Sequence, residues 1–248
     1  MGALRVEREG SVLRVTMSRP ETRNAFDKTL IEELSAAFVD VGAATAVVLA
    51  GQGQSFSAGA DLEWMRSSIG LSQEENVADA DAMRRMFEAI DACPAPVIAT
   101  VQGHAMGGGI GLVACADIAI AHTRTVFAFS EVKLGLIPAV ISPFVLRRIG
   151  DGPARRLFLT GERFDAAEAA RIGLVHEVSD DPAASLERVL AELAANGPRA
   201  VRHAKRLVLE RPDGPETARR IAERRASSEG QEGLTAFVEG RAPAWRDS

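Results

Sequence analysis

The chain of 248 residues contains no tyrosine and only two cysteines. The absence of tyrosine excludes any mechanism that relies on a tyrosine side chain. Cys93 and Cys115 stand in apolar surroundings and have no metal-ligand spacing, so we interpret both as small core residues. No metal site is therefore expected. We expect the chain to work in a reducing cytoplasm and to fold without disulfides.

Long hydrophobic runs and an excess of positive charge are also missing. No apolar run is long enough to span a bilayer, and the amino terminus lacks a charged start followed by an apolar core, so no membrane partner is expected. The net charge is −5 with both signs dispersed, which argues against nucleic acid as a partner. A hydrophobic content of 46% is ample for a substantial core of one large or two small domains.

The most informative stretch lacks the residues that known glycine motifs require. An apolar strand at residues 96–101 leads into three consecutive glycines, Gly107, Gly108 and Gly109. A phosphate loop would need Lys and Ser/Thr where Gly109 and Ile110 stand, and no His-Glu-x-x-His or Gly-x-Ser-x-Gly sequence occurs. Two interpretations remain: an oxyanion-binding helix start, or glycines that only allow close packing of a helix on a strand.

Hydrophobic periodicity predicts alternating strands and helices. A β-hairpin is expected at residues 4–8 and 12–17, and Asp27 is expected to cap a helix that runs through Phe38. Apolar strands and helical segments then alternate, which predicts a mainly parallel sheet covered by helices. The strands lie near residues 46–50, 96–101 and 117–121, and the helices near 75–91, 108–115 and 142–149. After residue 197 the composition becomes helical and charged.

Several segments together resemble one family, the enoyl-CoA hydratase/isomerase or crotonase superfamily. They are residues 19–25 (RPETRNA), 56–62 (FSAGADL), 103–111 (GHAMGGGIG), 130–138 (SEVKLGLIP), 157–164 (LFLTGERF) and 233–237 (GLTAF). The resemblance covers almost the whole chain. It implies an α/β fold class, a crotonase-like spiral of β-β-α units over residues 1–196, and a C-terminal helical oligomerisation region over residues 197–248. It also implies a homotrimer or a dimer of trimers.

The same resemblance assigns the catalytic groups. It places an oxyanion hole at the backbone N–H groups of Ala60 and Gly108, which would hold the thioester oxygen as it becomes an enolate. It makes Glu131 the catalytic carboxylate. Glu131 lies in an apolar segment, where desolvation raises a carboxyl pKa and suits the group to proton transfer near neutral pH. Asp61 is expected to cap a helix rather than to react.

The implied ligand is an acyl-CoA thioester, in which coenzyme A is part of the substrate, so no separate cofactor is expected. The resemblance puts substrate along two backbone segments and the glycine run, with Phe237 and Arg241 of the tail closing over it, from its own or another subunit. The substrate-binding residues are Arg23, Ala25, Ala58, Gly59, Asp61, Leu62, Gly107 and Phe237. His104 also stands near the glycine run, and we interpret it as a hydrogen-bonded loop histidine.

Gly111 is counted among the catalytic positions because the best-known hydratases carry a second glutamate there. Without that glutamate, Glu131 must both hold water and move its protons. A single carboxylate is sufficient for Δ3,Δ2-enoyl-CoA isomerisation, so that reaction is an alternative. A catalytically silent acyl-CoA-binding paralogue is another. Dienoyl-CoA isomerases and chlorobenzoyl-CoA dehalogenases are discounted, since they place an aspartate where this chain has Ala139.

Hydration is nonetheless favoured by three further segments. Residues 132–144 (VKLGLIPAVISPF), 158–164 and 173–177 (GLVHE) resemble bacterial hydratases of the methylglutaconyl-CoA type. Substrates of that type carry a distal carboxylate, which Lys133, Arg147 or Arg148 would meet. We therefore expect an enoyl-CoA hydratase that acts on a branched or carboxylated 2-enoyl-CoA.

Overall fold

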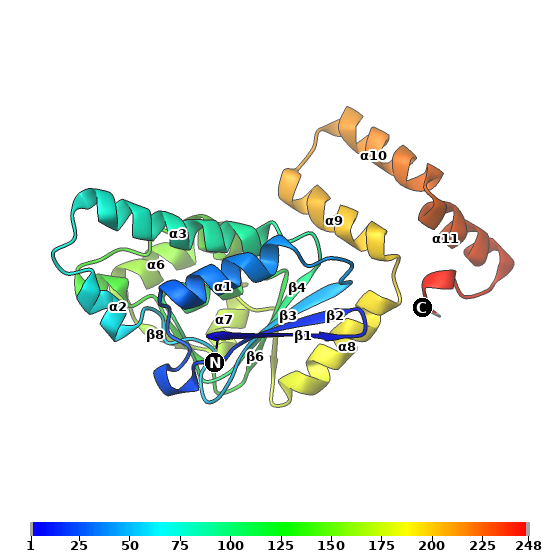
Figure 1. The fold of residues 1–248 in the computed structure, drawn as a ribbon. Coiled ribbons are helices and arrows are strands. Elements are labelled where there is room, and N and C mark those ends of the chain that lie inside the picture. The colour runs from blue at the N-terminus through cyan, green and yellow to red at the C-terminus, as the bar shows by residue number, and fades with distance from the viewer. Residues whose placement is uncertain (1, 247–248) are drawn as a thin grey trace.

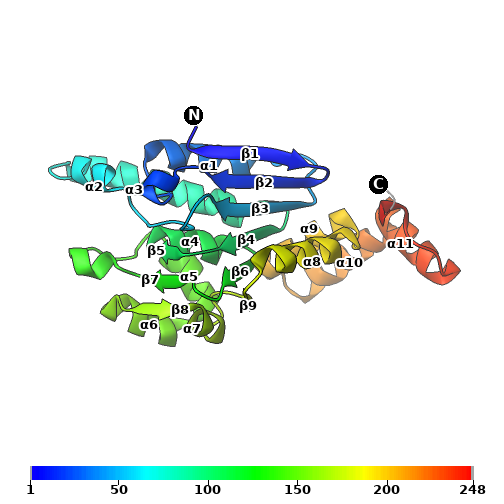
Figure 2. The same cartoon turned by 90° about the horizontal axis from the view of Figure 1, so that it is seen from below.

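A six-stranded sheet forms the centre of the molecule, which the computed structural model describes from residue 2 to residue 246. Its strands follow the order β1-β2-β3-β4-β6-β9. They comprise β1 (Leu4–Glu9), β2 (Val12–Met17), β3 (Ala46–Gly51), β4 (Val97–Val101), β6 (Ile118–His122) and β9 (Glu177–Ser179). The first two strands are antiparallel and every later pair is parallel. Figure 2 shows this succession from below.

A smaller sheet lies beside the first, and two of its strands are the second strands of β-β-α units (Figure 2). It contains β5 (His104–Met106), β7 (Val126–Ala128) and β8 (Arg163–Asp165). The chain runs from β4 through β5 to helix α4 (Gly108–Cys115), and from β6 through β7 to helix α5 (Ser142–Ile149). These are the β-β-α units that the family resemblance implied, and the expected α/β fold class is confirmed.

Helices cover both faces of the large sheet (Figure 1). Alternate strand residues point to opposite faces, so Val47 and Leu49 join one hydrophobic cluster while Ala46 and Val48 join the other. Helices α1 (Lys28–Val39), α3 (Gln73–Asp91), α4 and α5 pack on the first face, and α8 (Pro182–Ala194) packs on the second. The remaining helices of the body are α2 (Leu62–Ser67), α6 (Asp151–Thr160) and α7 (Ala166–Arg171).

The local predictions agree with these elements. The hairpin is formed, and Asp27 caps α1 by accepting a hydrogen bond from the Leu30 N–H at 2.8 Å. Cys93 and Cys115 are free and buried, and burial raises the pKa of both thiols, which leaves them protonated and unreactive. Within residues 2–246, no helix is long and apolar enough to cross a membrane.

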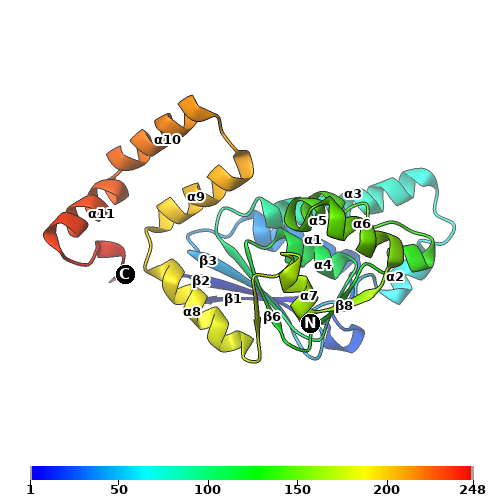
Figure 3. The same cartoon turned by 180° about the vertical axis from the view of Figure 1, so that it is seen from behind.

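Three C-terminal helices form an arm that extends away from the body (Figures 1 and 3). They are α9 (Pro198–Glu210), α10 (Gly214–Ala226) and α11 (Ser228–Glu239). The first is tied to the body by Lys205, whose Nζ lies 2.6 Å from Asp117 Oδ2. Arg202 adds a hydrogen bond of 2.7 Å to the Ala44 carbonyl. The division at residue 197 and the oligomerisation role of this region stay predictions.

Close backbone approach fixes the loops that follow the central strands. The buried Asn24 side chain donates to the carbonyls of Gln52 and Ser55, each at 2.9 Å, and so holds the turn after β3. Gly103, with φ of 63°, crosses that turn so closely that a Cβ atom there would lie 1.8 Å from the Gln54 carbonyl oxygen. Only glycine fits this crossing.

We expect Gly103→Ala to lower the free energy of unfolding by roughly 3 kcal/mol more than Gly10→Ala. Both glycines have positive φ, but a Cβ at Gly10 meets nothing within 4 Å, so the control isolates the steric clash. Urea unfolding of the two variants measures the difference. Equal losses would show that the crossing of the two loops tolerates a side chain.

Candidate active site

A short backbone pairing between Phe26 and Ala60 builds the first half of the site. The Phe26 N–H donates to the Gly59 carbonyl at 2.7 Å, and the Asp61 N–H donates to the Phe26 carbonyl at 2.9 Å. This pairing skips the N–H of Ala60, for which residues 2–246 provide no hydrogen-bond acceptor. Ala60 is exposed, so its N–H is available to a ligand.

The glycine run builds the second half at the start of α4. Gly107 has φ of 49° and anchors the turn by donating its N–H to the Ala128 carbonyl at 3.0 Å. Gly108 is the first residue of α4, and its N–H has no acceptor in the part of the chain that the structure describes. Free N–H groups at a helix N-terminus favour negative charge. Both predicted oxyanion donors therefore have unoccupied N–H groups.

Glu131 stands against the glycine run at the start of the 3-10 helix Glu131–Leu134. A Cβ at Gly107 would lie 3.0 Å from Glu131 Oε1, so the missing side chain of Gly107 is what makes room for the carboxylate. Glu131 Oε2 is buried and has no hydrogen-bond partner among residues 2–246. Burial raises the pKa of the Glu131 carboxyl above its ordinary value, as the apolar segment predicted.

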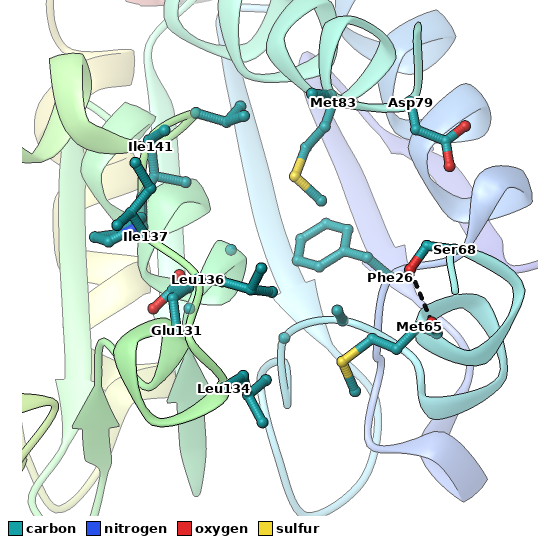
Figure 4. Close-up of a pocket in the computed structure, with 18 of the residues that line it drawn as sticks. Phe26, Met65, Ser68, Asp79, Met83, Glu131, Leu134, Leu136, Ile137 and Ile141 are labelled. Atoms are coloured by element: carbon teal, nitrogen blue, oxygen red, sulfur yellow. Dashed lines mark hydrogen bonds between the residues drawn. The ribbon is translucent and has the colours of Figure 1, made fainter. Parts of the chain in front are cut away.

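One cavity of about 360 Å³ brings these groups together. Figure 4 shows Glu131 on one wall and Phe26, Met65 and Met83 on the other. Most of the lining is apolar or small, and the charged residues of this lining, within the described chain, are Glu131 and Asp79. Six of the predicted site residues line it: Ala58, Gly59, Ala60, Gly107, Gly108 and Glu131.

Gly111 does not line the cavity. It is buried in α4, where a Cβ atom would lie 2.4 Å from Ile141 Cγ2 and 2.8 Å from the Phe87 ring. Ile141 itself belongs to the cavity wall, so Gly111 stands behind that wall. The position counted as catalytic thus contributes no group, and a second glutamate there would collide with Ile141.

Asp61 acts as a helix cap, as predicted. Its Oδ1 accepts hydrogen bonds from the N–H groups of Glu63 at 2.8 Å and Trp64 at 3.4 Å. Arg19 links this cap to the cap of α1, with Nη2 3.2 Å from Asp61 and Nη1 3.0 Å from Asp27. One guanidinium therefore links the starts of α1 and α2.

Three other predicted substrate-binding residues lie outside the cavity lining. Arg23 and Leu62 are exposed, and Ala25 is buried. Their backbone segments border the cavity, since Ala58 N–H donates to the Arg23 carbonyl at 2.9 Å. Whether they bind the coenzyme A moiety stays a prediction.

Phe237 and the site are far apart within one chain. Phe237 is 86% exposed on α11, at the end of the arm, whereas the cavity lies in the body beside α2 and α3 (Figures 1 and 4). Arg241 is held by ion pairs with Glu232 and Glu239. A closing role for Phe237 therefore requires a second copy of the chain.

The remaining candidates are engaged elsewhere. His104 Nδ1 lies 3.3 Å from Ser55 Oγ, in agreement with a hydrogen-bonded loop histidine. Arg147 pairs with Asp91, and Arg148 donates to the Ala116 carbonyl at 2.9 Å. Neither arginine lines the cavity, and Lys133 does not line it either.

Sequence reasoning missed the wall that α2 and α3 provide. Trp64, Met65 and Ser68 line the cavity from α2 and its C-terminal cap, and Asp79 and Met83 line it from α3. Helical periodicity assigns an apolar residue such as Met83 to the core and a polar one such as Asp79 to solvent, so it contains no signal for a cavity between two helices.

Comparison with known proteins shows the family to which the chain belongs. Residues 7–248 match the enoyl-CoA hydratase/isomerase family. A putative enoyl-CoA hydratase of Thermus thermophilus is 34% identical over 247 residues, which cover 95% of this chain and 97% of the relative. The crystal structure of an enoyl-CoA hydratase from Shewanella pealeana has 41% identity and a TM-score of 0.93, covering 98% of this chain and 96% of that one. Pseudomonas aeruginosa AtuE has 38% identity and a TM-score of 0.94, covering 98% and 99%.

We expect Glu131→Gln to melt a few degrees above the wild type at pH 7. An ionised carboxylate without a partner is costly to bury, whereas a neutral amide is less so. Burial raises the pKa of Glu131 in the folded protein above its unfolded value of about 4.3. Above that pH the unfolded chain ionises Glu131 more readily than the folded protein does, so the wild type loses free energy of unfolding. The difference in melting temperature should therefore vanish as the pH falls below that value. Melting curves between pH 4 and 8 measure it; a difference independent of pH would contradict the burial argument.

We expect Gly111→Ala to cost roughly 1–3 kcal/mol of unfolding free energy by overpacking. Ile141→Ala removes the Cγ2 atom nearest to the new methyl group, so the double variant should lose less than the sum of the two single losses. Denaturant unfolding of the two single variants and the double variant measures the coupling. Strict additivity would mean that the two residues are not in contact.

Proposed function

The chain belongs to the enoyl-CoA hydratase/isomerase family, and on that basis we propose that it is an enoyl-CoA hydratase, which adds water across the 2,3 double bond of an enoyl-CoA thioester. One observation carries the proposal. The buried, unpartnered Glu131 Oε2 belongs to a carboxylate that lines the same cavity as Ala60 and Gly108, whose N–H groups lack an acceptor within residues 2–246. A base and two fixed donors around one apolar cavity suit chemistry next to a thioester carbonyl.

The two N–H groups act on the carbonyl oxygen. As the nucleophile adds at C3, electrons move onto this oxygen and an enolate forms. Donors already fixed in an apolar site stabilise that charge without reorganising, by roughly 3–4 kcal/mol for each donor. Ala60 and Gly108 donate from the main chain, so their side chains take no part in this step.

Glu131 moves the protons. Its carboxylate accepts a proton from water as the water oxygen forms its bond to C3, and the resulting carboxylic acid then gives that proton to C2 of the enolate. The carboxylate is regenerated and one water has been added. The raised pKa of Glu131 supports this cycle, because a stronger base accepts the first proton more readily. Coenzyme A is carried by the substrate, so the cycle uses no separate cofactor.

The lining of the cavity supports a short acyl group that includes branched chains. Met83, Leu136 and Ile137 provide apolar contacts. A carboxylated substrate such as a 3-methylglutaconyl thioester would meet Ser68 and Asn76 as uncharged polar partners, since Lys133, Arg147 and Arg148 lie outside the lining. We keep branched and carboxylated 2-enoyl-CoA esters as the proposed substrate class.

A second candidate, Δ3,Δ2-enoyl-CoA isomerase, is favoured by the packing around Gly111. Ile141 and Phe87 occupy the space of a second carboxylate, so water is held by Glu131 alone. A single carboxylate is sufficient to remove a proton from C2 of a 3-enoyl thioester and to return it to C4. The same two oxyanion donors would stabilise the enolate between these steps.

The arm supports the proposed assembly. Val208, Ile221, Phe237 and Val238 expose apolar side chains on α9–α11, and such patches are typical of protein interfaces. We infer a homotrimer or a dimer of trimers that works in the cytoplasm. Light scattering of the purified protein measures the number of chains.

The proposed reaction predicts that absorbance of the conjugated thioester falls when the enzyme meets 2-enoyl-CoA substrates, including crotonyl-CoA and 3-methylglutaconyl-CoA. Mass spectrometry should show a product heavier by one water. A rise in absorbance with a 3-enoyl-CoA, without added water, would establish the isomerase instead. Binding of acyl-CoA without turnover of any ester would indicate a silent paralogue.

In the same assay we expect Glu131→Gln to lower kcat by roughly 10²–10⁴-fold, because the amide cannot accept the proton. Glu187→Gln is the matched control, since Glu187 is an exposed glutamate that contacts Arg14 on the surface. In the wild type, kcat/KM should fall toward low pH with an apparent pKa above about 4.3, as the raised pKa of Glu131 requires. Full activity of Glu131→Gln would refute the assignment.

A further inference from the structure

Helix α2 forms one wall of the cavity although it is only weakly packed. It has six residues, none of them buried. Trp64 is nevertheless partly buried against the main hydrophobic cluster, and it lines the cavity together with Met65. Besides the Asp61 cap at the start of α2, the packing of Trp64 on that cluster therefore positions this wall.

A hydrogen bond from Trp64 joins α2 to α3. Trp64 Nε1 donates to Asp79 Oδ2 at 3.3 Å, and Asp79 Oδ1 lies 3.5 Å from Lys28 Nζ of α1. The Asp79 side chain is 24% exposed, so solvent competes with the bond only in part. One carboxylate thus connects three helices at the edge of the cavity.

Figure 4 shows where this connection lies relative to the chemistry. Asp79 and Met83 lie on the opposite side of the cavity from Glu131. If the thioester is held between Glu131, Ala60 and Gly108, the acyl chain must extend toward the α2–α3 wall. The volume of about 360 Å³ is near the lower end of the roughly 300–1,000 Å³ found for ligand pockets, so the wall leaves little room for a long chain.

We propose that Asp79 is a positioning residue that selects short acyl chains by holding Trp64, and with it α2, against the cavity. The inference rests on the proposed function, because it assigns the size of the acyl group at that same site. Asp79 touches neither the reacting carbons nor Glu131. Asp79 affects which acyl chains fit the cavity. Its role is therefore measured by how much more tightly the protein binds short acyl chains than long ones.

The test measures the dissociation constants of two saturated esters, butyryl-CoA and decanoyl-CoA, by calorimetry with the full-length protein. Saturated esters bind without reacting, so the result does not depend on turnover. We expect the wild type to bind butyryl-CoA at least about tenfold more tightly than decanoyl-CoA. Asp79→Leu removes the acceptor and Trp64→Phe removes the donor, so each should reduce the ratio to within about threefold.

Two variants serve as controls. Asp79→Asn keeps an oxygen that can accept from Trp64 Nε1, so it should keep the wild-type ratio. Asp81→Leu makes the matched change on the same helix, where Asp81 pairs with Arg84 and Arg85 away from the cavity, and it should also keep the ratio. The double variant of Asp79→Leu and Trp64→Phe should match the single ones, because all three lack the same bond.

The outcomes separate this inference from the function on which it rests. The inference is overturned if folded Asp79→Leu keeps the wild-type ratio of the two dissociation constants, or if the wild type binds both esters equally well. Either result leaves the hydratase proposal standing. A wild type that binds neither ester would overturn the proposed function. If Asp79→Leu does not fold, Trp64→Phe decides the question through the same ratio.

Discussion

The site depends on the close approach of two backbone segments that only glycine permits. The loop after β3 lies directly on β5 and the start of α4, and glycines stand at three of the closest approaches. A Cβ at Gly103 would collide with the Gln54 carbonyl, one at Gly59 would lie 3.0 Å from the Met106 carbonyl, and one at Gly109 would lie 3.0 Å from Ser57. This approach places the N–H of Ala60 in the same cavity as the N–H of Gly108. Larger residues would separate the two donors.

Another glycine of the same region, Gly107, leaves space beside a destabilising group. Glu131 has a buried oxygen without a partner among residues 2–246, which opposes folding, and a Cβ at Gly107 would lie 3.0 Å from its other carboxylate oxygen. A large hydrophobic cluster that includes Phe26 and Phe87 provides the compensating stability. Burial raises the pKa of Glu131, so the feature that is costly for folding is also the one that makes the group a better base.

Two parts of the cavity surroundings bear on the proposed function. Ile141 and Phe87 fill the space that a side chain at position 111 would need, so no second carboxylate fits there. On the other side, Trp64 and Asp79 connect two helices that would otherwise share little packing. In the proposed function the first wall bears on the proton transfers, and in the further inference the second bears on the size of the acyl group. Neither wall consists of residues that react.

The sequence by itself indicated the main elements and, through its resemblance to one family, the candidate residues of the site. Period-2 and period-3.6 patterns located most strands of the large sheet and the helices α1, α3, α4 and α5, and Asp27 and Asp61 were predictable as caps, because these are local rules. The roles expected of the glycine run and Glu131 came instead from the resemblance of several segments to one family. Only the tertiary structure decided that Gly111 has no room for a side chain, that Arg147 and Arg148 are engaged outside the cavity, and that α2 and α3 form its wall. The reason is physical: each of these facts depends on which atoms from distant parts of the chain come into contact, and no local pattern in the sequence contains that information.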